Sequence, residues 1–292
     1  MHLGYIGFGS LGAAVAERLV KEGNELIIWN RTTLKAEQYS LKMNIEGFEN
    51  KVTLVNSPHE VVENTEICFL NLFDSKAVKA VLTAENGILS ADLTGKIIAD
   101  ITTNDFREIP EFYDIVQAKG GKYVECPVAG SVVPALKGLL VSLVSADAES
   151  FAKVKPIIEQ YSKHVFFLEK PTLATKMKLI NNDALGTIMA VIAETVALSE
   201  KVGIPRDQAL EILSVGGANS GVMNAKKDKL ASDNFETHFA CKTIFKDLNF
   251  VQALAYELGQ PAFLGSLTKE MYAQTLLQGL SDADFAAIYK IL

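Results

Sequence analysis

The sequence has few of the residues that mark a disulfide-stapled or metal-bound protein. Its 292 residues include only three cysteines, Cys68, Cys126 and Cys241, which lie far apart and form no Cys-x-x-Cys pair. Widely spaced cysteines without neighbouring histidines argue against a disulfide framework and against a metal site. We therefore expect no bound metal and a reducing compartment.

An excess of basic charge is also absent. Lysine and arginine number 28 against 35 aspartate and glutamate residues, which gives a net charge of -7 at pH 7. This balance argues against nucleic acid, or an anionic membrane surface, as the main partner. It leaves room for a small anionic substrate, because one local basic site is enough to bind one.

No apolar run is long enough to cross a bilayer. The most apolar later stretch, residues 185–198, is short and contains Glu194. The first predicted strand starts at residue 2, which leaves no room for a signal peptide ahead of it. The expected location is the cytoplasm, with no membrane association.

What the sequence does contain is a regular alternation of strand and helix patterns over residues 1–163. Strands are predicted at 2–6, 25–29, 52–55, 67–72, 97–101, 122–124, 139–144 and 164–168. Helices are predicted at 10–22, 33–45, 58–63, 75–82, 105–118 and 147–160. Such alternation indicates an α/β fold with a doubly wound, mostly parallel Rossmann sheet, here assigned to residues 1–163.

Strand patterns end near residue 170, and helical patterns continue to the end of the chain. Residues 173–202 read as one long helix, apolar on most faces, which predicts burial within a helical body. Further helices are predicted at 206–214, 219–230, 239–257, 261–278 and 284–290, separated by glycines. We expect an all-helical domain over residues 164–292.

A glycine-rich motif follows the first strand directly. Its residues are Gly7, Phe8, Gly9, Ser10, Leu11 and Gly12. In a strand–turn–helix context the first glycine permits the tight turn, the second lets a pyrophosphate approach, and the third allows close packing. This context predicts dinucleotide binding at the start of the first helix.

The end of the second strand predicts which dinucleotide is preferred. An NAD site usually has Asp or Glu there, but this chain has Asn30, Arg31 and Thr32. A guanidinium and a hydroxyl suit a 2′-phosphate, and no carboxylate is present to repel it. We predict NADP(H), with NAD left open; the alternative is that Arg31 is an ordinary solvated loop residue.

Five motifs together resemble one family. After the N-terminal glycines come Asp100-Ile-Thr102-Thr103, the segment 125–131, Lys178-Leu-Ile-Asn-Asn182, and the segment 239–248 with Lys246-Asp247. Their order and the chain length resemble the β-hydroxyacid dehydrogenases, a family that includes 3-hydroxyisobutyrate dehydrogenase, tartronate semialdehyde reductase and 6-phosphogluconate dehydrogenase. The resemblance implies hydride transfer between a nicotinamide and a small hydroxy acid or its carbonyl counterpart.

In this family Lys178 corresponds to the catalytic lysine. An ammonium group stabilises the negative charge that develops on a carbonyl oxygen during reduction and then donates a proton; neutral lysine does the reverse. Asn182 lies one helical turn on and is expected to bind the substrate oxygen or orient the lysine. The alternative is that Lys178 is a surface lysine.

The resemblance also assigns cofactor contacts outside the glycine motif. Thr103 is expected beside the nicotinamide ribose, Asn71 and Leu72 along the cofactor, and Lys246 near its charge. Each could instead be a turn residue or a solvated helix lysine.

The substrate segment departs from the family pattern. Where the family has Asp-x-Pro-Val-Ser-Gly-Gly, this chain has Glu125-Cys-Pro-Val-Ala129-Gly130-Ser131. Backbone N–H groups at Ala129, Gly130 and Ser131 are still expected to hold a substrate carboxylate. Thr172 and Ala174 also replace usual glycines before the lysine.

The sequence thus predicts an NADP(H)-dependent oxidoreductase acting on a small anionic carbonyl or hydroxy acid, such as a semialdehyde or glyoxylate. Two alternatives stay open: an imine reductase-like enzyme, although those commonly lack the lysine, and a catalytically silent NADP(H)-binding protein. The apolar helices further predict a homodimer or homotetramer.

Overall fold

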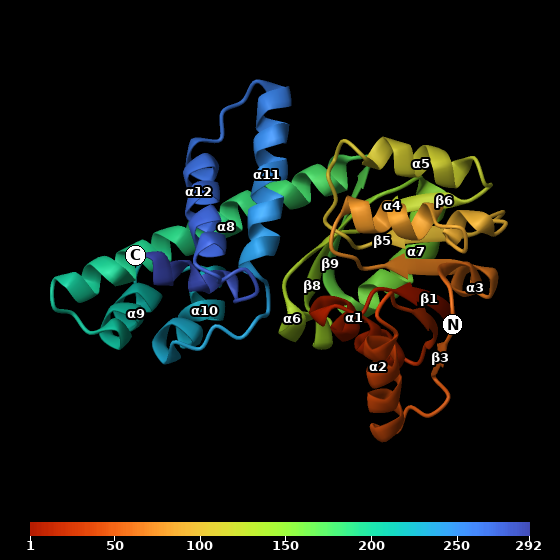
Figure 1. Cartoon of the computed structure of the whole chain (residues 1–292), viewed down its shortest axis with the longest axis horizontal. Coiled ribbons are helices and arrows are strands. Elements are labelled where there is room, and N and C mark those ends of the chain that lie inside the picture. Colours follow the sequence, from red (N-terminus) through yellow and green to blue (C-terminus); the bar gives the residue numbers. More distant parts are fainter. The chain divides into compact units, whose positions relative to one another are not determined.

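The computed structural model describes all 292 residues, which form two compact units, Met1–Lys178 and Leu179–Leu292 (Figure 1). The first unit is one sheet with helices on both faces, and the second is built of helices. The predicted fold class is therefore confirmed.

The sheet has nine strands in the order β3-β2-β1-β4-β5-β6-β8-β7, with β9 paired to β8. The strands are β1 His2–Ile6, β2 Glu25–Trp29, β3 Val52–Leu54, β4 Ile67–Leu70, β5 Ile97–Asp100, β6 Lys122–Glu125, β7 Val128–Ala129, β8 Leu140–Ser145 and β9 Ser162–Glu169. Strands β1 to β6 pair in parallel, whereas β8 runs antiparallel to β6 and β7. The strand order reverses between β1 and β4, which is where ligands bind in open α/β sheets.

Alternate residues of the strands pack into two separate hydrophobic cores, one on each face of the sheet. In β1, Leu3 and Tyr5 face one core and Ile6 faces the other; Phe69 and Leu70 divide in the same way in β4. Helices α1 Ser10–Lys21, α2 Thr33–Ile45, α6 Val132–Leu136 and α7 Ala148–Tyr161 cover the first face. The second face is covered by α3 Pro58–Glu63, α4 Ser75–Thr83, the 3₁₀ turn η1 Ile88–Ser90 and α5 Ile109–Gln117. Burial on both faces explains the near-continuous apolar runs of these strands.

The second unit has a single core of its own. Its helices are α8 Leu173–Lys201, which starts in the first unit, then α9 Arg206–Val215, α10 Gly221–Ser232, α11 Cys241–Leu258, α12 Phe263–Leu277 and the 3₁₀ segment η2 Phe285–Ile291. The expectation that α8 is buried all round is wrong, because one side exposes Ile180, Ile188, Val191 and Leu198. None of the helices combines the length and hydropathy needed to cross a membrane.

Three further expectations differ from the structure. The helix predicted at 105–118 starts only at Ile109. The Asp105 side chain accepts a hydrogen bond from the Arg107 N–H (3.1 Å), which stabilises a turn ahead of the helix. The predicted last helix is 3₁₀, with Asp284 capping Ala286. The domain boundary at 163/164 falls inside β9, and the first unit extends to Lys178 because β9 pairs with β8.

Candidate active site

At two positions of the glycine-rich loop between β1 and α1, neighbouring atoms lie so close that only glycine fits. Gly7 has a φ of +109°, and a Cβ there would lie 2.2 Å from the Asn71 carbonyl oxygen. A Cβ on Gly12 would lie 2.1 Å from the Gly7 carbonyl oxygen. Gly9 differs, because no atom lies within 4 Å of where its Cβ would stand. Gly7 and Gly12 therefore serve packing, and Gly9 leaves its backbone open to a ligand.

Helix α1 starts directly after this open glycine. It has no side-chain cap and no acidic residue in its first turn. The unpaired N–H groups of a helix N-terminus and the helix dipole both favour a negatively charged group there. The loop and helix together can accept a pyrophosphate.

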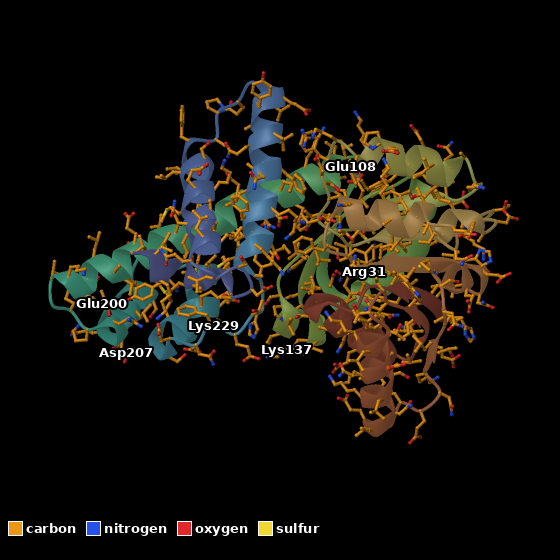
Figure 2. The ribbon with its side chains drawn as sticks, viewed as in Figure 1. Arg31, Glu108, Lys137, Glu200, Asp207 and Lys229 are labelled. Carbon is orange, nitrogen blue, oxygen red and sulfur yellow. The ribbon has the colours of Figure 1, made fainter.

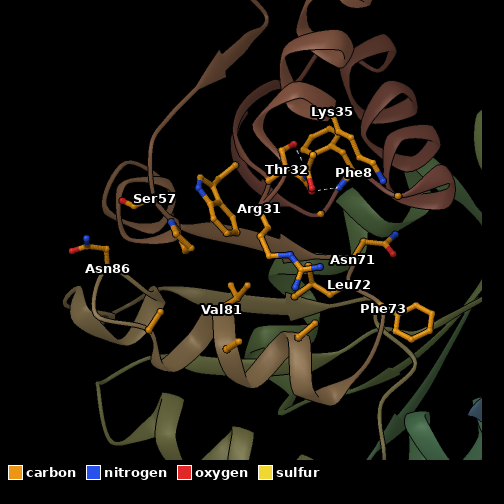
Figure 3. A pocket seen from close by; sticks show the side chains of 18 of the residues that line it. Phe8, Arg31, Thr32, Lys35, Ser57, Asn71, Leu72, Phe73, Val81 and Asn86 are labelled. Atoms are coloured by element: carbon orange, nitrogen blue, oxygen red, sulfur yellow. Dashed lines mark hydrogen bonds between the residues drawn. The ribbon is translucent and has the colours of Figure 1, made fainter.

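A cavity of about 600 Å³ lies beside the loop, which is the size of a small-molecule site (Figure 3). The ends of β1, β2 and β4 and the exposed side of α4 form its walls. Eight of the residues predicted to contact the cofactor line it: Gly7, Phe8, Gly9, Asn30, Arg31, Thr32, Asn71 and Leu72.

Positively charged side chains outnumber negatively charged ones in this cavity. Arg31 and Lys35 line it, and Glu85 is its one carboxylate. Figure 2 labels Arg31 on the whole chain, and Figure 3 shows its side chain extending from the end of β2 toward Leu72. Sequence reasoning missed Lys35, although a signal existed: a lysine in the first turn of α2 is unfavourable for the helix dipole and so needs another reason.

Asn30 has a structural task in this chain. Its Oδ1 accepts from the Phe8 N–H (3.0 Å), and its Nδ2 donates to the Thr32 carbonyl (2.8 Å). The side chain thus ties the glycine loop to the end of β2. Asn30 lines the cavity, but its side-chain amide is hydrogen-bonded within the protein. Arg31, Thr32 and Lys35 are therefore the side chains of this region that can contact a ligand.

The loops after β1, β4 and β5 are joined at the carboxyl edge of the sheet. Asn71 donates its N–H to the Ile6 carbonyl (2.9 Å), and Leu72 donates to the Thr102 Oγ1 (2.9 Å). Thr102 is buried and its hydroxyl is used within the protein, whereas Thr103 is half-buried. Thr103 does not line the cavity described above.

Two further predicted residues lie just outside that cavity. Ser10 is exposed and lines a second hollow of about 440 Å³, which shares Phe8 and Gly9 of the glycine loop with the first cavity. Leu11 packs against the first core.

The predicted substrate segment forms a turn after a short strand. Ala129 belongs to β7 and pairs with Val141 of β8. Gly130 has a φ of +125°, and a Cβ there would lie 2.5 Å from Leu140 Cδ2. Ser131 precedes α6 without capping it. The glycine is required by the turn, and Ala129 and Ser131 are half-buried beside it.

Lys178 lies in the second turn of α8 and is only 7% exposed. Lysines are rarely so buried without a partner or a task. Lys176, two residues earlier, lies over the Phe106 ring with its Nζ 5.5 Å from the ring centroid. Of the two lysines, Lys178 is the buried one.

In the second unit, Asn182 belongs to a chain of polar contacts centred on Asp247. The Asn182 Nδ2 donates to Asp247 Oδ2 (2.6 Å), and both residues are fully buried. The other oxygen, Oδ1, lies 3.1 Å from the Lys246 Nζ. Sequence reasoning singled out Asn182 and Lys246 but gave no role to Asp247, which links them. The position of Asp247 directly after Lys246 in the sequence was the available indication that Asp247 has a role.

Comparison with known proteins identifies the family. Residues 2–169 match the NAD binding domain of 6-phosphogluconate dehydrogenase, and residues 173–292 match a domain described as NAD-binding of NADP-dependent 3-hydroxyisobutyrate dehydrogenase. The chain belongs to this dehydrogenase family. The resemblance predicted from the five motifs is therefore confirmed, as is a nicotinamide dinucleotide as the family's cofactor.

Individual relatives differ in length and in name. The chain is 29% identical over 290 residues to glyoxylate/succinic semialdehyde reductase 2 of Arabidopsis thaliana, covering 99% of this chain and 79% of the relative. It is 28% identical over 289 residues to the cytokine-like nuclear factor N-PAC of Anopheles gambiae, covering 99% of this chain and 50% of the relative. The chain thus spans about half the length of that relative. The fold matches 3-hydroxyisobutyrate dehydrogenase from Salmonella typhimurium with a TM-score of 0.90, 21% identity and full coverage of both chains.

Proposed function

We propose that this chain is an NADP(H)-dependent oxidoreductase that transfers hydride between the nicotinamide and a small β-hydroxy acid or aldehyde or keto acid. The observation that carries the proposal is the cavity beside the glycine loop, with Arg31 and Lys35 in its wall and no carboxylate on the β2 end. Family membership supports the reaction class. The substrate and the phosphate preference are our inference.

The preference for the phosphorylated dinucleotide follows from charge. A 2′-phosphate carries negative charge and three acceptor oxygens, which a guanidinium binds through parallel hydrogen bonds. Lys35 would add a second cation from the first turn of α2. NAD lacks this phosphate, so we expect it to bind more weakly rather than not at all.

Lys178 is the proposed general acid. When bound, the reduced cofactor supplies hydride to the substrate carbonyl carbon. The Lys178 ammonium stabilises the charge that develops on the carbonyl oxygen and donates a proton to it, which leaves a hydroxyl group and a neutral amine. In the oxidative direction the neutral amine takes the hydroxyl proton.

We propose that Asn182 holds the substrate oxygen or the lysine. Its donation to Asp247 fixes the orientation of the amide, so that a single geometry is presented. Backbone N–H groups at Ala129, Gly130 and Ser131 are the proposed anchor for a substrate carboxylate. Thr103, Asn71, Leu72 and Lys246 stay proposed cofactor contacts.

A small aldehyde acid is the substrate class we favour. The replacement of the usual serine and glycine by Ala129 and Ser131 moves one hydroxyl donor within the anchor, which changes substrate fit but not the acid/base chemistry. The name of the Arabidopsis relative, glyoxylate/succinic semialdehyde reductase, supports testing these two aldehyde acids first.

A catalytically silent NADP(H)-binding protein is the second candidate, and the N-PAC relatives favour it because their name describes a nuclear factor rather than an enzyme. Retention of both Lys178 and Asn182 favours the enzyme, and Lys178 also argues against an imine reductase.

The test is a panel of substrates with each cofactor. Purified protein is mixed with NADPH or NADH and with glyoxylate, succinic semialdehyde or a cyclic imine; the oxidative direction uses NADP⁺ and 3-hydroxyisobutyrate. We expect turnover of at least one aldehyde acid, faster at low NADPH than at low NADH. NADPH binding without turnover would instead support the silent binder, and turnover of the imine alone the imine reductase.

We also propose a homodimer or homotetramer and a cytoplasmic location. The exposed apolar side of α8 supports self-association. The three cysteines are buried and form no disulfide, which fits a reducing compartment.

A further inference from the structure

The start of α8 is capped by side chains from the sheet. Glu125 at the end of β6 accepts from the Thr172 N–H through Oε1 (2.6 Å). Its Oε2 accepts from the Thr175 N–H (3.1 Å) and from the Thr175 hydroxyl (2.6 Å). Ser145 at the end of β8 accepts from the Ala174 N–H (3.0 Å). Two strand ends thus bind the first turn of the helix.

Capping from outside is needed because the residue before the helix cannot do it. An N-cap residue normally has extended backbone, which lets its own side chain accept from the first turn. Thr172 instead has a φ of +73°, in the left-handed region. Its backbone N–H therefore points to Glu125, and the carboxylate takes the place of the usual cap.

Glu125 is well suited to hold this turn. It is fully buried, and both of its oxygens are occupied by donors from α8 or the residue before it. Burial raises the pKa of this carboxyl, and the hydrogen bonds from Thr175 and Thr172 act in the opposite direction. Negative charge at a helix N-terminus is also favoured by the helix dipole.

The capped turn leads directly to the lysine. Lys178 lies three residues after Thr175, so the two side chains leave α8 on neighbouring parts of one face. A rotation of the first turn would move the Lys178 ammonium, and a misplacement of about 1 Å can cost about 100-fold in rate. We infer that Glu125 is a positioning residue that sets the direction of Lys178 by fixing the first turn of α8; this inference rests on the proposed role of Lys178.

The substitutions in this chain are consistent with such a device. Glu125 stands where the family pattern has aspartate, and Thr172 stands where glycine is usual. The longer side chain lets one carboxylate reach both the Thr172 and the Thr175 N–H groups. The Thr175 hydroxyl adds a third donor to the same group.

Three variants and one control test the inference. Glu125→Gln places an amide NH₂ against a backbone N–H and so loses an acceptor. Thr175→Val removes one donor while keeping the side-chain shape, and Thr175→Ser restores it. Glu17→Gln is the matched control, because Glu17 is also buried in the first unit but is bonded to Lys21 and Lys42, away from α8.

Hydrogen exchange of the segment 172–178 and NADPH binding are measured first. We expect faster exchange in Glu125→Gln and Thr175→Val, wild-type exchange in Thr175→Ser and Glu17→Gln, and an unchanged Kd for NADPH. With glyoxylate or succinic semialdehyde, kcat should fall about 10- to 100-fold in Glu125→Gln. It should fall about tenfold in Thr175→Val and recover in Thr175→Ser. The pH profile of kcat should shift in the first two variants only.

Unchanged exchange in Glu125→Gln and Thr175→Val would overturn the inference, as would faster exchange with unchanged kcat and pH profile. If the wild-type protein turns over none of the substrates, the proposed function fails separately. The inference is then judged by the pH dependence of acetylation of the Lys178 amine with acetic anhydride. A shift of its midpoint in Glu125→Gln, absent in Glu17→Gln, supports the inference, and an unchanged midpoint overturns it.

Discussion

At the residue scale, the proposed preference for NADP(H) over NAD(H) rests on two side chains in the wall of one cavity. Arg31 extends from the end of β2, and Lys35 stands in the first turn of α2, where a cation weakens the helix. A bound phosphate would compensate for that unfavourable position. The proposed phosphate site would thus use both cations.

Arg31→Ala should therefore separate the two cofactors. Loss of a charged hydrogen bond of about 1.5–3 kcal/mol predicts a rise in KM for NADPH of about 10- to 100-fold, with KM for NADH nearly unchanged. Lys35→Ala should act in the same direction, and Lys42→Ala, which lies on α2 outside this cavity, should not. Steady-state kinetics measure KM for NADPH and for NADH in each variant. An equal loss for NADPH and NADH would contradict the assignment of the phosphate site.

Thr172 offers a prediction for stability. A β-branched residue at a φ of +73° is strained by about 1–2 kcal/mol, and glycine removes this strain at a cost of about 0.5–1 kcal/mol in the unfolded chain. Thr172→Gly should raise the free energy of unfolding by about 0.5–1 kcal/mol. Urea unfolding measures this difference. Thr53→Gly, on the exposed side of β3, is the control and should destabilise; a loss of stability in both would contradict the strain argument.

The sequence predicted eight of the twenty residues that line the cavity, but not all of their tasks. Gly7, Gly9 and Gly12 could be assigned because the motif determines the backbone geometry. The structural task of Asn30 could not be predicted, because its hydrogen bonds with Phe8 and Thr32 depend on the three-dimensional course of the loop. Asp247 was missed for the same reason, since its partner Asn182 lies sixty-five residues earlier in the chain.

At the element scale, helix α7 shows how one side chain starts a helix. Asp147 accepts from the Ser150 N–H (2.9 Å) and from the Ser150 hydroxyl (2.8 Å). Burial acts to raise the pKa of this carboxyl, but the Ser150 hydrogen bonds and Lys122 more than offset it and hold the pKa below its usual value. The cap is therefore strongest when Asp147 is ionised.

Asp147→Ala should lower the free energy of unfolding by about 1 kcal/mol near pH 7. Since the pKa is lowered in the folded state, this stabilisation is fully present above the ordinary aspartate pKa of about 3.9 and is lost as the pH falls below it. Urea unfolding of wild type and variant at pH 7 and near pH 3.5 should show the difference shrinking. Asp147→Asn keeps an acceptor and serves as the control. A difference that grows at low pH would contradict this account of the cap.

Elements were predictable where the pattern was long and local. Strands β1, β2 and β4 and helices α1 and α8 followed from periodicity and flanking glycines. Strand β7 with two residues and helix α6 with five are too short to carry a period and were missed. The late start of α5 depended on the Asp105 turn, a side-chain contact that competes with helical bonding.

At the scale of the whole molecule, the exposed side of α8 predicts self-association. Ile180, Val191 and Leu198 are exposed by 49%, 59% and 60%, which is costly for apolar side chains in water. A second copy of the chain is the partner we propose, because symmetric pairing would cover the same side on both copies.

Val191→Glu combined with Leu198→Glu should therefore convert the proposed oligomer to monomer, because two charges would be buried at the contact. Light scattering after gel filtration gives the mass directly. Lys227→Glu, an exposed change on α10, controls for added negative charge. A wild-type protein that is monomeric at all concentrations would contradict the proposal.

Lys178 is the residue that we propose makes this dinucleotide-binding chain an oxidoreductase. The most direct measurement compares NADPH binding and NADPH oxidation in wild type and Lys178→Ala, with glyoxylate and succinic semialdehyde as substrates. Loss of an acid/base group predicts a fall in kcat of about 100- to 10,000-fold, with the Kd for NADPH unchanged. Equal turnover by the two proteins would contradict the account.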